Sequence, residues 1–147
     1  MRVSHNTFVN NRTHIVMPGR TNGLGATDLV FSNNIIQGES GTALTLPGPT
    51  PGARYEGNLV FGVANGALPA GGVRRMDPQL SRDAAGIFRP LSSSPAIDAS
   101  VGSYSEVSVD LDGQPRSGPR DVGADEASSA PTLNRPLTPA DVGPGAR

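Results

Sequence analysis

The chain has 147 residues, enough for one domain or for part of one. It contains no Cys, which excludes a disulfide framework and a thiolate metal site. Its 12 basic residues, all of them Arg, nearly balance 13 acidic residues, and no apolar run approaches membrane-spanning length, so we expect neither a nucleic-acid nor a membrane partner.

Three Asn residues each introduce a short apolar run within the first 62 residues. The runs begin at Asn6, Asn34 and Asn58, which lie 28 and 24 positions apart. This spacing is typical of a β-solenoid in which one rung consists of three short strands joined by turns. Asn tolerates left-handed backbone, so we expect it to form the bend. Stacked Asn amides would also satisfy groups that are otherwise buried without partners.

Segments on either side of each Asn predict two short strands per rung, and residues 14–17 and 42–46 predict the third. The connections at 18–23 and 47–52 are rich in Pro and Gly, which excludes helix there. Four Phe, two Tyr and no Trp favour a narrow, aliphatic core. The predicted strand pairs around the Asn bends are 3–5 with 7–9, 29–31 with 35–36, and 54–56 with 59–61.

The rung pattern decays after Gly62. Residues 65–73 predict a loop, and one helical turn is expected at 81–85 before a Gly. Residues 127–134 read as a polar, disorder-prone linker, and 138–141 carry the N-cap and first-turn Pro of a short helical turn. The predicted organisation is therefore rungs at 1–76, a C-terminal capping module at 77–126 and a tail at 127–147.

The N-terminal segment Met1–Asn6 has no apolar signal core and enters a strand pattern at once. A solenoid needs a terminal cap over its open rung, and none precedes Val3. We therefore expect further rungs upstream in a longer parent protein.

Five segments after residue 76 occur in an order that resembles the terminal module of secreted right-handed parallel β-helix proteins of bacteria. This resemblance implies an all-β fold, the last rungs of a right-handed parallel β-helix closed by an irregular C-terminal cap. The segments are Asp77–Leu80, Phe88–Pro90, Ser94–Ala99, Asp110–Arg116 and Asp121–Glu126.

Together with the three Asn runs and the ending Arg135–Pro144, these segments make the chain similar to the C-terminal part of a family 6 polysaccharide lyase. This family includes chondroitinase B and related alginate lyases. One departure is Ser100, where this ending more usually has Gly. The resemblance implies a secreted or periplasmic protein that acts on an anionic polysaccharide.

Lyases of this kind cleave uronic-acid glycans by β-elimination. The resemblance implies that Ca²⁺ neutralises the uronate carboxylate, a Lys removes the neighbouring proton, and an Arg assists the leaving oxygen. These groups belong to rungs upstream of the matched region. The present chain contains no Lys, and no calcium cluster of the family is recognisable in it. We therefore assign no catalytic residue and no metal ligand to this chain, and expect it to be inactive alone.

Arg12, His14 and Arg20 follow the first rung and are the candidate substrate-binding residues. Arg pairs with carboxylates in bidentate fashion, so these residues could line a sugar-binding groove. The alternative is a solvated Arg and a His on a turn. Similarly, His5 is either catalytic or a structural or solvent-facing residue, and Arg74 and Arg75 either meet a glycan or are solvated.

Residues 110–113 (Asp-Leu-Asp-Gly) allow two interpretations. Closely spaced carboxylates before Gly can hold Ca²⁺, but the remaining ligands of a full loop are missing, and a tight turn closed by Asp side chains is the alternative. Several other charges predict ion pairs that lock the capping module onto the last rung. These are Asp98, Asp121, Asp125 and Glu126 with Arg89, Arg116 and Arg120.

Two functions remain open. The first is a C-terminal piece of a uronan lyase, acting on alginate or on chondroitin- or dermatan-type chains, whose partners are the anionic polysaccharide and the upstream rungs. The second is a non-catalytic β-helix surface or carbohydrate-binding protein with the same cap. A self-contained short protein would leave an open sheet edge prone to association.

Overall fold

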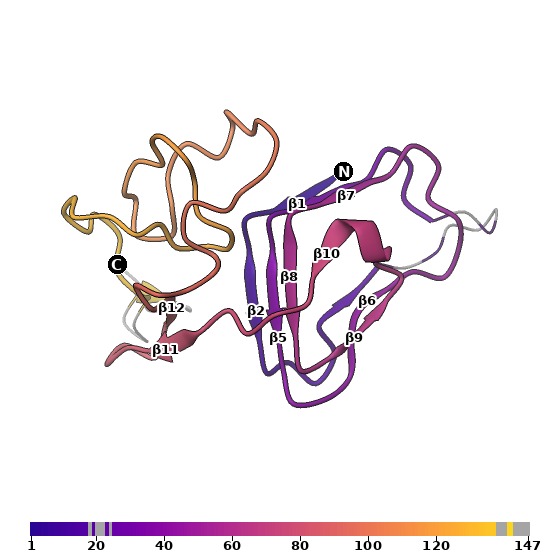
Figure 1. Cartoon of the computed structure of the whole chain (residues 1–147), viewed down its shortest axis with the longest axis horizontal. Helices are drawn as coiled ribbons and strands as arrows, with labels where there is room; N and C mark the ends of the chain where they lie inside the picture. Colours follow the sequence, from indigo (N-terminus) through magenta and orange to yellow (C-terminus); the bar gives the residue numbers. More distant parts are fainter. Residues whose placement is uncertain (18, 20–22, 24, 138–140, 143–147) are drawn as a thin grey trace.

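The computed structural model describes residues 1–17, 19, 23, 25–137 and 141–142. Within them the protein is almost entirely β, with three parallel sheets and no α-helix. The chain passes through the three sheets in turn and does so three times (Figure 1). We call residues 2–16, 30–45 and 54–66 rungs 1, 2 and 3. The Arg20 prediction and the helical turn predicted at 138–141 lie outside or largely outside the described residues.

Each sheet takes one strand from each rung. The first sheet is β1 (Arg2–Ser4), β4 (Val30–Ser32) and β7 (Arg54–Glu56), and the second contains β2 (Thr7–Val9), β5 (Ile35–Gln37) and β8 (Asn58–Phe61). The third is β3 (Ile15–Val16), β6 (Thr42–Thr45) and β9 (Ala64–Gly66), and β10 (Val73–Arg74) extends the second beyond β8 after the 3₁₀ turn Ala70–Gly72. The loop predicted at 65–73 is therefore wrong in part, because β9 and β10 lie at its two ends. These strands of three and two residues are too short to show the apolar alternation that could reveal them.

The register is continuous from rung to rung. Phe8 pairs with Ile36 and Ile36 pairs with Val60, so equivalent positions stack. Inside the three sheets, buried aliphatic side chains form a narrow core around Phe31, as the composition predicted. The opposite face of the second sheet carries Ile35 and Leu59, which the C-terminal segment covers with Ala96 and Val122.

The three Asn residues form a ladder between the rungs. The backbone N–H and side-chain amide of Asn6 both donate to Asn34 Oδ1, and those of Asn34 donate to Asn58 Oδ1, at 3.0–3.1 Å. The predicted stacking of amides is confirmed. The left-handed bend, however, is not at these Asn residues. It falls one position earlier, at His5 (φ 53°), Asn33 (φ 52°) and Gly57 (φ 67°), so the prediction that the ladder Asn takes positive φ is wrong.

This row of bend residues positions the C-terminal segment. His5 Nε2 lies 3.1 Å from Ser100 Oγ, and the Asn33 side chain exchanges two hydrogen bonds of 2.9 Å with the backbone of Val101. At Gly57 a Cβ would lie 2.7 Å from Val101 Cγ2, so the loop could not approach a larger residue there. The loop at 100–102 is thus held against all three rungs.

After the parallel strands the chain forms the antiparallel hairpin of β11 (Leu80–Arg82) and β12 (Phe88–Pro90), followed by irregular segments. In Figure 1 these segments lie on the side of β2 and β5, away from β6 and β9. The helical turn predicted at 81–85 is wrong. Asp83 N–H donates to the carbonyl of Ile87, and Gly86 takes φ +86°, so the chain closes a hairpin turn in place of a helix.

Candidate functional site

Arg12 lies in the bend after β2 at the edge of an open hollow of about 360 Å³. Asn10 and Asn11 flank it on the same rung, and Gly38, Glu39 and Ser40 face it from the next rung. The Arg12 side chain is exposed and makes no hydrogen bond or ion pair with the described residues. Its guanidinium is therefore available to a carboxylate from outside the chain.

His14 does not share this hollow with Arg12. Its ring is 9% exposed and turns inward, so that a Cβ placed on Gly38 would lie 2.8 Å from His14 Nε2. Neither ring nitrogen has a hydrogen-bond partner among the described residues, and burial lowers the pKa of His14. A neutral, enclosed imidazole cannot pair with a uronate carboxylate. Arg12 and His14 therefore do not line one groove. The alternative of a solvated Arg and a His on a turn agrees with the exposed Arg12 and with the place of His14 between the bend at 12–13 and β3, although the His14 ring is buried.

His5 is buried, 5% exposed, against Tyr104, with which it makes an edge-to-face ring contact at 5.5 Å. Burial, with smaller contributions from the charges of Arg116 and Arg120, lowers its pKa to about 4. The sequence prediction of a structural His agrees with this position. Its contact to the loop at 100–104 could not have been read from the rung pattern.

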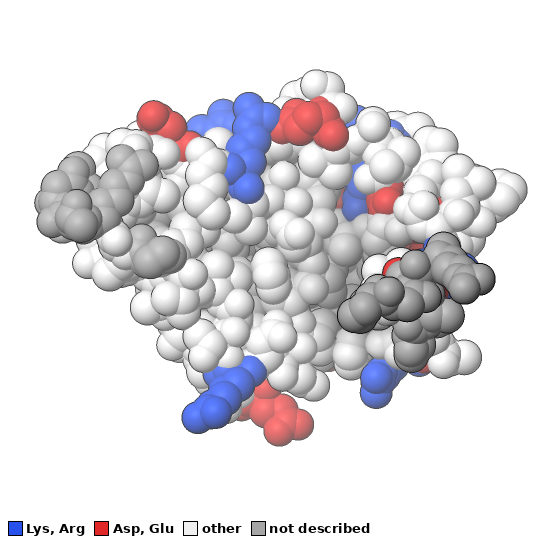
Figure 2. Space-filling model, turned by 180° about the vertical axis from the view of Figure 1, so that it is seen from behind, with Lys and Arg blue, Asp and Glu red and all other residues white. Residues whose placement is uncertain are grey.

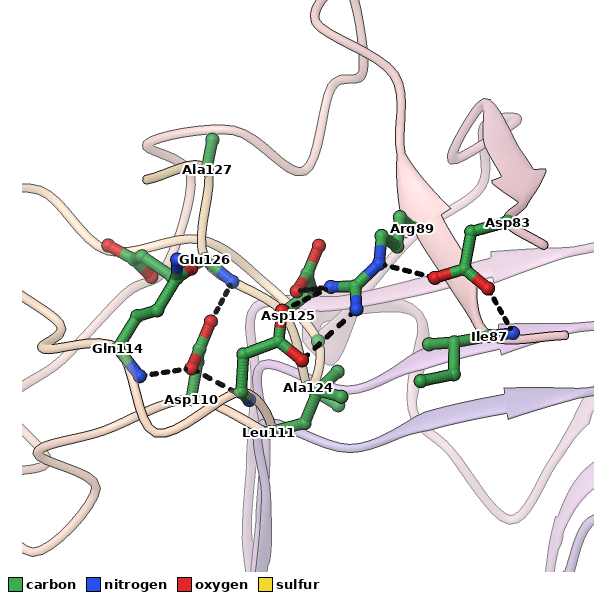
Figure 3. A network of polar contacts seen from close by, with 12 residues as sticks. Asp83, Ile87, Arg89, Asp110, Leu111, Gln114, Ala124, Asp125, Glu126 and Ala127 are labelled. Atoms are coloured by element: carbon green, nitrogen blue, oxygen red, sulfur yellow. Dashed lines mark hydrogen bonds and ion pairs between the residues drawn. The ribbon is translucent and has the colours of Figure 1, made fainter. Parts of the chain in front are cut away.

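Arg89 on β12 is the centre of the densest charge network in the described part of the chain (Figure 3). Its Nε donates to Asp83 at 2.8 Å, and its two terminal nitrogens bind Asp112 at 2.8 and 3.0 Å. Nη1 also donates to Asp125 at 2.6 Å. One guanidinium thus serves three carboxylates, which raises the pKa of Arg89 and lowers that of Asp83.

The pKa of Asp125 is shifted in the opposite direction from that of Asp83. Its burial, and the nearby charges of Asp112 and Asp110, raise its pKa to about 6, although Arg89 opposes the shift. The shared guanidinium gives Asp112 a two-point contact and Asp125 a single one, so Asp125 is the least compensated of the group. Excess negative charge is thus built into this part of the protein.

Asp110 closes the turn that the sequence allowed as an alternative to a metal loop. Its Oδ1 accepts from the backbone N–H of Asp112 (2.9 Å) and Gln114 (2.7 Å), and its Oδ2 accepts from Glu126 N–H at 3.2 Å. Gly113 takes φ +77°. In Figure 3 the Asp110 carboxylate points at these amides and its lone pairs are largely used.

Asp110, Asp112 and Asp125 nevertheless bring carboxylate oxygens within 4.8 Å of one another. Ca²⁺ takes six to eight oxygen ligands and needs those oxygens free. Here the cation among them is the Arg89 guanidinium, and the Asp110 oxygens already accept backbone N–H groups. These residues do not fit a calcium site while Arg89 is in place.

Calcium is accordingly expected to leave the stability of this chain unchanged. Adding millimolar CaCl₂ or EDTA should each move the midpoint of thermal unfolding by less than about 1 °C, because a ligand stabilises a fold only by binding to it. Differential scanning calorimetry of the 147-residue chain measures this. MgCl₂ at the same ionic strength is the control for screening, and a rise of several degrees with Ca²⁺ alone would show that the ion displaces Arg89.

Two predicted ion pairs of the capping segment are present: Asp125 with Arg89, and Glu126 with Arg116 at 2.8 Å. Asp121 instead accepts backbone N–H groups of Asp98 and Ala127. The Asp98 side chain makes no ion pair among the described residues, and it is the Asp98 backbone that is bound. Both pairs lie within residues 77–126, so the prediction that they lock this segment onto the last rung is wrong: these charges hold the segment itself together, and only some do so by pairing with Arg.

Other charges are dispersed. Figure 2 shows basic and acidic side chains next to one another at the margins of one face, with a broad uncharged area between them. Arg74, predicted as a possible glycan contact, is half-buried and donates to the carbonyl of Ala99 at 3.2 Å. Arg75 contacts Asn65 at 2.6 Å. Neither residue lines the hollow beside Arg12 in the described part of the chain.

Comparisons with known proteins do not identify the chain. No family model matches it, and no curated protein and no solved structure is significantly similar to it. Within the described residues, no helix has the length and apolar character needed to cross a membrane. The functional argument therefore depends on the residues and their geometry.

Proposed function

We propose that residues 1–76 are the last rungs of a right-handed parallel β-helix, and that the chain is the non-catalytic C-terminal end of a polysaccharide lyase acting on uronic-acid glycans. The observation that carries the architectural part is the stack of three rungs in continuous register with its Asn ladder. Alginate is the first candidate substrate and chondroitin- or dermatan-type chains the second. The family assignment, and with it a secreted or periplasmic location, rests on the sequence resemblance.

The free edge of rung 1 supports upstream rungs as a partner. Strands β1, β2 and β3 each lie at the edge of a parallel sheet. Asn34 Oδ1 and Asn58 Oδ1 each accept two hydrogen bonds from the preceding rung, whereas Asn6 Oδ1 accepts none from the described residues. In the ladder, the Asn of one rung donates its backbone N–H and side-chain amide to Oδ1 of the Asn in the next rung, so an Asn in a rung before rung 1 would donate to Asn6 Oδ1. An uncovered edge of this kind also favours association.

A non-catalytic role is consistent with the chemistry present. Removal of the proton beside a uronate carboxylate needs a base within hydrogen-bond reach and a cation to stabilise the developing charge. The chain has no Lys, and neither His5 nor His14 is among the residues that line the two hollows found in the described structure. The acidic group around Arg89 does not fit Ca²⁺. In this proposal the catalytic Lys, Arg and calcium ligands belong to upstream rungs.

Arg12 is the described residue best placed to contact the polymer. It is exposed, has no hydrogen-bond or ion-pair partner among the described residues, and lies next to a hollow that spans two rungs. The same observation favours the second candidate, a non-catalytic surface or carbohydrate-binding protein, because a single Arg beside a hollow binds a carboxylate without any chemistry. The two functions differ in whether upstream rungs carry the base.

The deciding experiment follows the ultraviolet absorbance of the unsaturated uronate product. The 147-residue chain mixed with alginate and Ca²⁺ is expected to give no increase, and the longer parent protein with upstream rungs is expected to give one. Chondroitin and dermatan sulfate are tested in parallel. An increase from the 147 residues alone would mean elimination without Lys and would overturn the proposal, whereas a longer protein that binds alginate without cleaving it would establish the second candidate.

A further inference from the structure

A cavity of about 290 Å³ lies in the C-terminal segment, between the loops at 100–104 and 118–120. Its polar lining includes Ser100, Ser103 and Arg120, with Tyr104 at one wall. Small-molecule pockets run from ~300 to ~1,000 Å³, so this cavity suits one small ligand or one end group of a chain. No carboxylate side chain lines it.

Arg120 is fixed but not neutralised. Its Nη1 donates to the backbone carbonyls of Tyr104 and Val107, which hold the guanidinium against the loop. Unlike Arg89 and Arg116, it makes no ion pair with a carboxylate in the described part of the chain. Its Nε and Nη2 donate to no described residue. Arg120 therefore borders the cavity with a positioned positive charge that keeps unused donors among the described residues.

Ser100 is oriented by His5 from the first rung. His5 Nε2 lies 3.1 Å from Ser100 Oγ, and His5 Nδ1 is buried with no partner among the described residues. The lowered pKa keeps the ring neutral at neutral pH, so only one nitrogen carries a proton. A buried N–H without an acceptor is rarer than a buried acceptor without a donor. The proton therefore belongs on Nε2, which donates to Ser100 Oγ and leaves the hydroxyl hydrogen for the cavity.

We infer that this cavity binds a carboxylate, held by the Arg120 guanidinium and the Ser100 hydroxyl. The identification of that carboxylate as a uronate unit deepens, and rests on, the function proposed above. The negative charge of Glu56 lies close to the cavity wall and opposes tight binding of a carboxylate. The Glu56 carboxylate accepts a hydrogen bond from Tyr104 OH, and a Cβ placed on Gly102 would lie 2.9 Å from Glu56 Oε1. We therefore expect millimolar affinity for a single uronate.

The direction of the hydrogen bond between His5 Nε2 and Ser100 Oγ distinguishes this binding site from the site of a Ser nucleophile. A Ser nucleophile would have to donate its proton to His5 Nε2, which requires the proton of the ring to be on Nδ1, where no acceptor is found among the described residues. With the proton on Nε2, His5 is a positioning residue and Ser100 is a donor to the ligand. The ¹⁵N chemical shifts of His5 report which tautomer is present.

The test is an NMR titration of the full 147-residue chain with glucuronate, acetate and glucose. Glucuronate and acetate should shift the resonances of the 100–104 and 118–120 loops, and glucose should not. Arg120→Gln should weaken glucuronate at least about 10-fold, and Ser100→Ala about 3- to 10-fold, as expected for hydrogen bonds to a charged group. Arg75→Gln, which removes an equal charge elsewhere, should change nothing.

Arg120→Gln also removes two contacts to backbone carbonyls, so the Ser100→Ala variant provides an independent reading if the loop is disturbed. The inference is overturned if neither acid binds, if glucose binds equally well, if both variants bind glucuronate normally, or if His5 carries its proton on Nδ1. Cleavage by the longer parent protein is measured separately, so failure of the lyase proposal leaves the acetate and glucuronate result interpretable.

Discussion

Asn34→Ala is expected to lower the free energy of unfolding by at least about 3 kcal/mol. Asn34 is fully buried at the middle of the ladder. Its Oδ1 accepts from the backbone and side chain of Asn6, and its amide donates to Asn58 Oδ1 and to the carbonyl of Val3. The substitution leaves several of these groups inside without partners, and each such group costs about 1–3 kcal/mol.

Urea unfolding of the 147-residue chain, followed by circular dichroism, measures this effect. Asn11→Ala is the matched control, since Asn11 is exposed in a bend and should change stability by less than about 0.5 kcal/mol. Asn6→Ala should fall between the two, because Asn6 is half-buried and its Oδ1 has no donor among the described residues. Equal losses at Asn6 and Asn34 would show that the ladder does not stabilise the rungs as a series.

Arg89→Gln is expected to lower the free energy of unfolding by about 2–3 kcal/mol at pH 8. Removal of one member of a buried charge group leaves the others uncompensated, at a cost of about 3–5 kcal/mol when burial is complete. The Arg89 side chain is 29% exposed, so the lower figure applies. Asp112 and Asp125 would then face each other without a cation between them.

The effect of Arg89→Gln should shrink below pH 6. The pKa of Asp125, about 6, is above its value of roughly 3.9 in the unfolded chain, so the folded state binds more protons between these values and stability falls as pH rises through that window. Without Arg89 the Asp125 pKa rises further, which steepens the fall. Asp83 acts in the opposite sense, because its pKa is lowered: its contribution to stability is present above its ordinary pKa and is lost as the pH falls through the lowered one.

Unfolding of wild type and variant between pH 4.5 and 8 tests this dependence. Arg12→Gln, which removes an exposed charge that has no hydrogen bond or ion pair among the described residues, is the control and should be nearly neutral. Adding Asp125→Asn to Arg89→Gln should recover part of the loss and flatten the pH dependence, since residues in one network are not additive. A loss independent of pH would mean that Arg89 stabilises the hairpin by packing alone.

Sequence and structure agree best where one residue's role is set by its neighbours in the repeat. The strands flanking Asn34 and Asn58 fall within a residue or two of their predicted limits, because the apolar run and the bend are both local. The third strand of rung 3 was missed, since Ala64–Gly66 has no apolar alternation and forms only by pairing with β6. Likewise, 81–85 has helix-compatible residues, and the pairing of β11 with β12 overrides them.

The candidate site residues divide in the same way. Arg12 is exposed, which both of its interpretations require, while His14 is enclosed beneath Gly38. The direction of a side chain at the end of a strand depends on what the next rung places beside it. No periodicity in a single rung contains that information.

The sequence by itself determined the repeat, the narrow aliphatic core and the positions of the Asn ladder, because period, residue volume and amide hydrogen bonding are local properties of each rung. Only the tertiary structure decided that His5 would orient Ser100, 95 positions away, and that Arg89 would gather Asp112 and Asp125 from 23 and 36 positions away. The first contact forms where the irregular C-terminal segment folds back onto the bends of the rungs, and the others form within that segment. These contacts form because buried polar groups need hydrogen-bond partners, and which groups are buried next to each other is set by the fold and not by the local sequence.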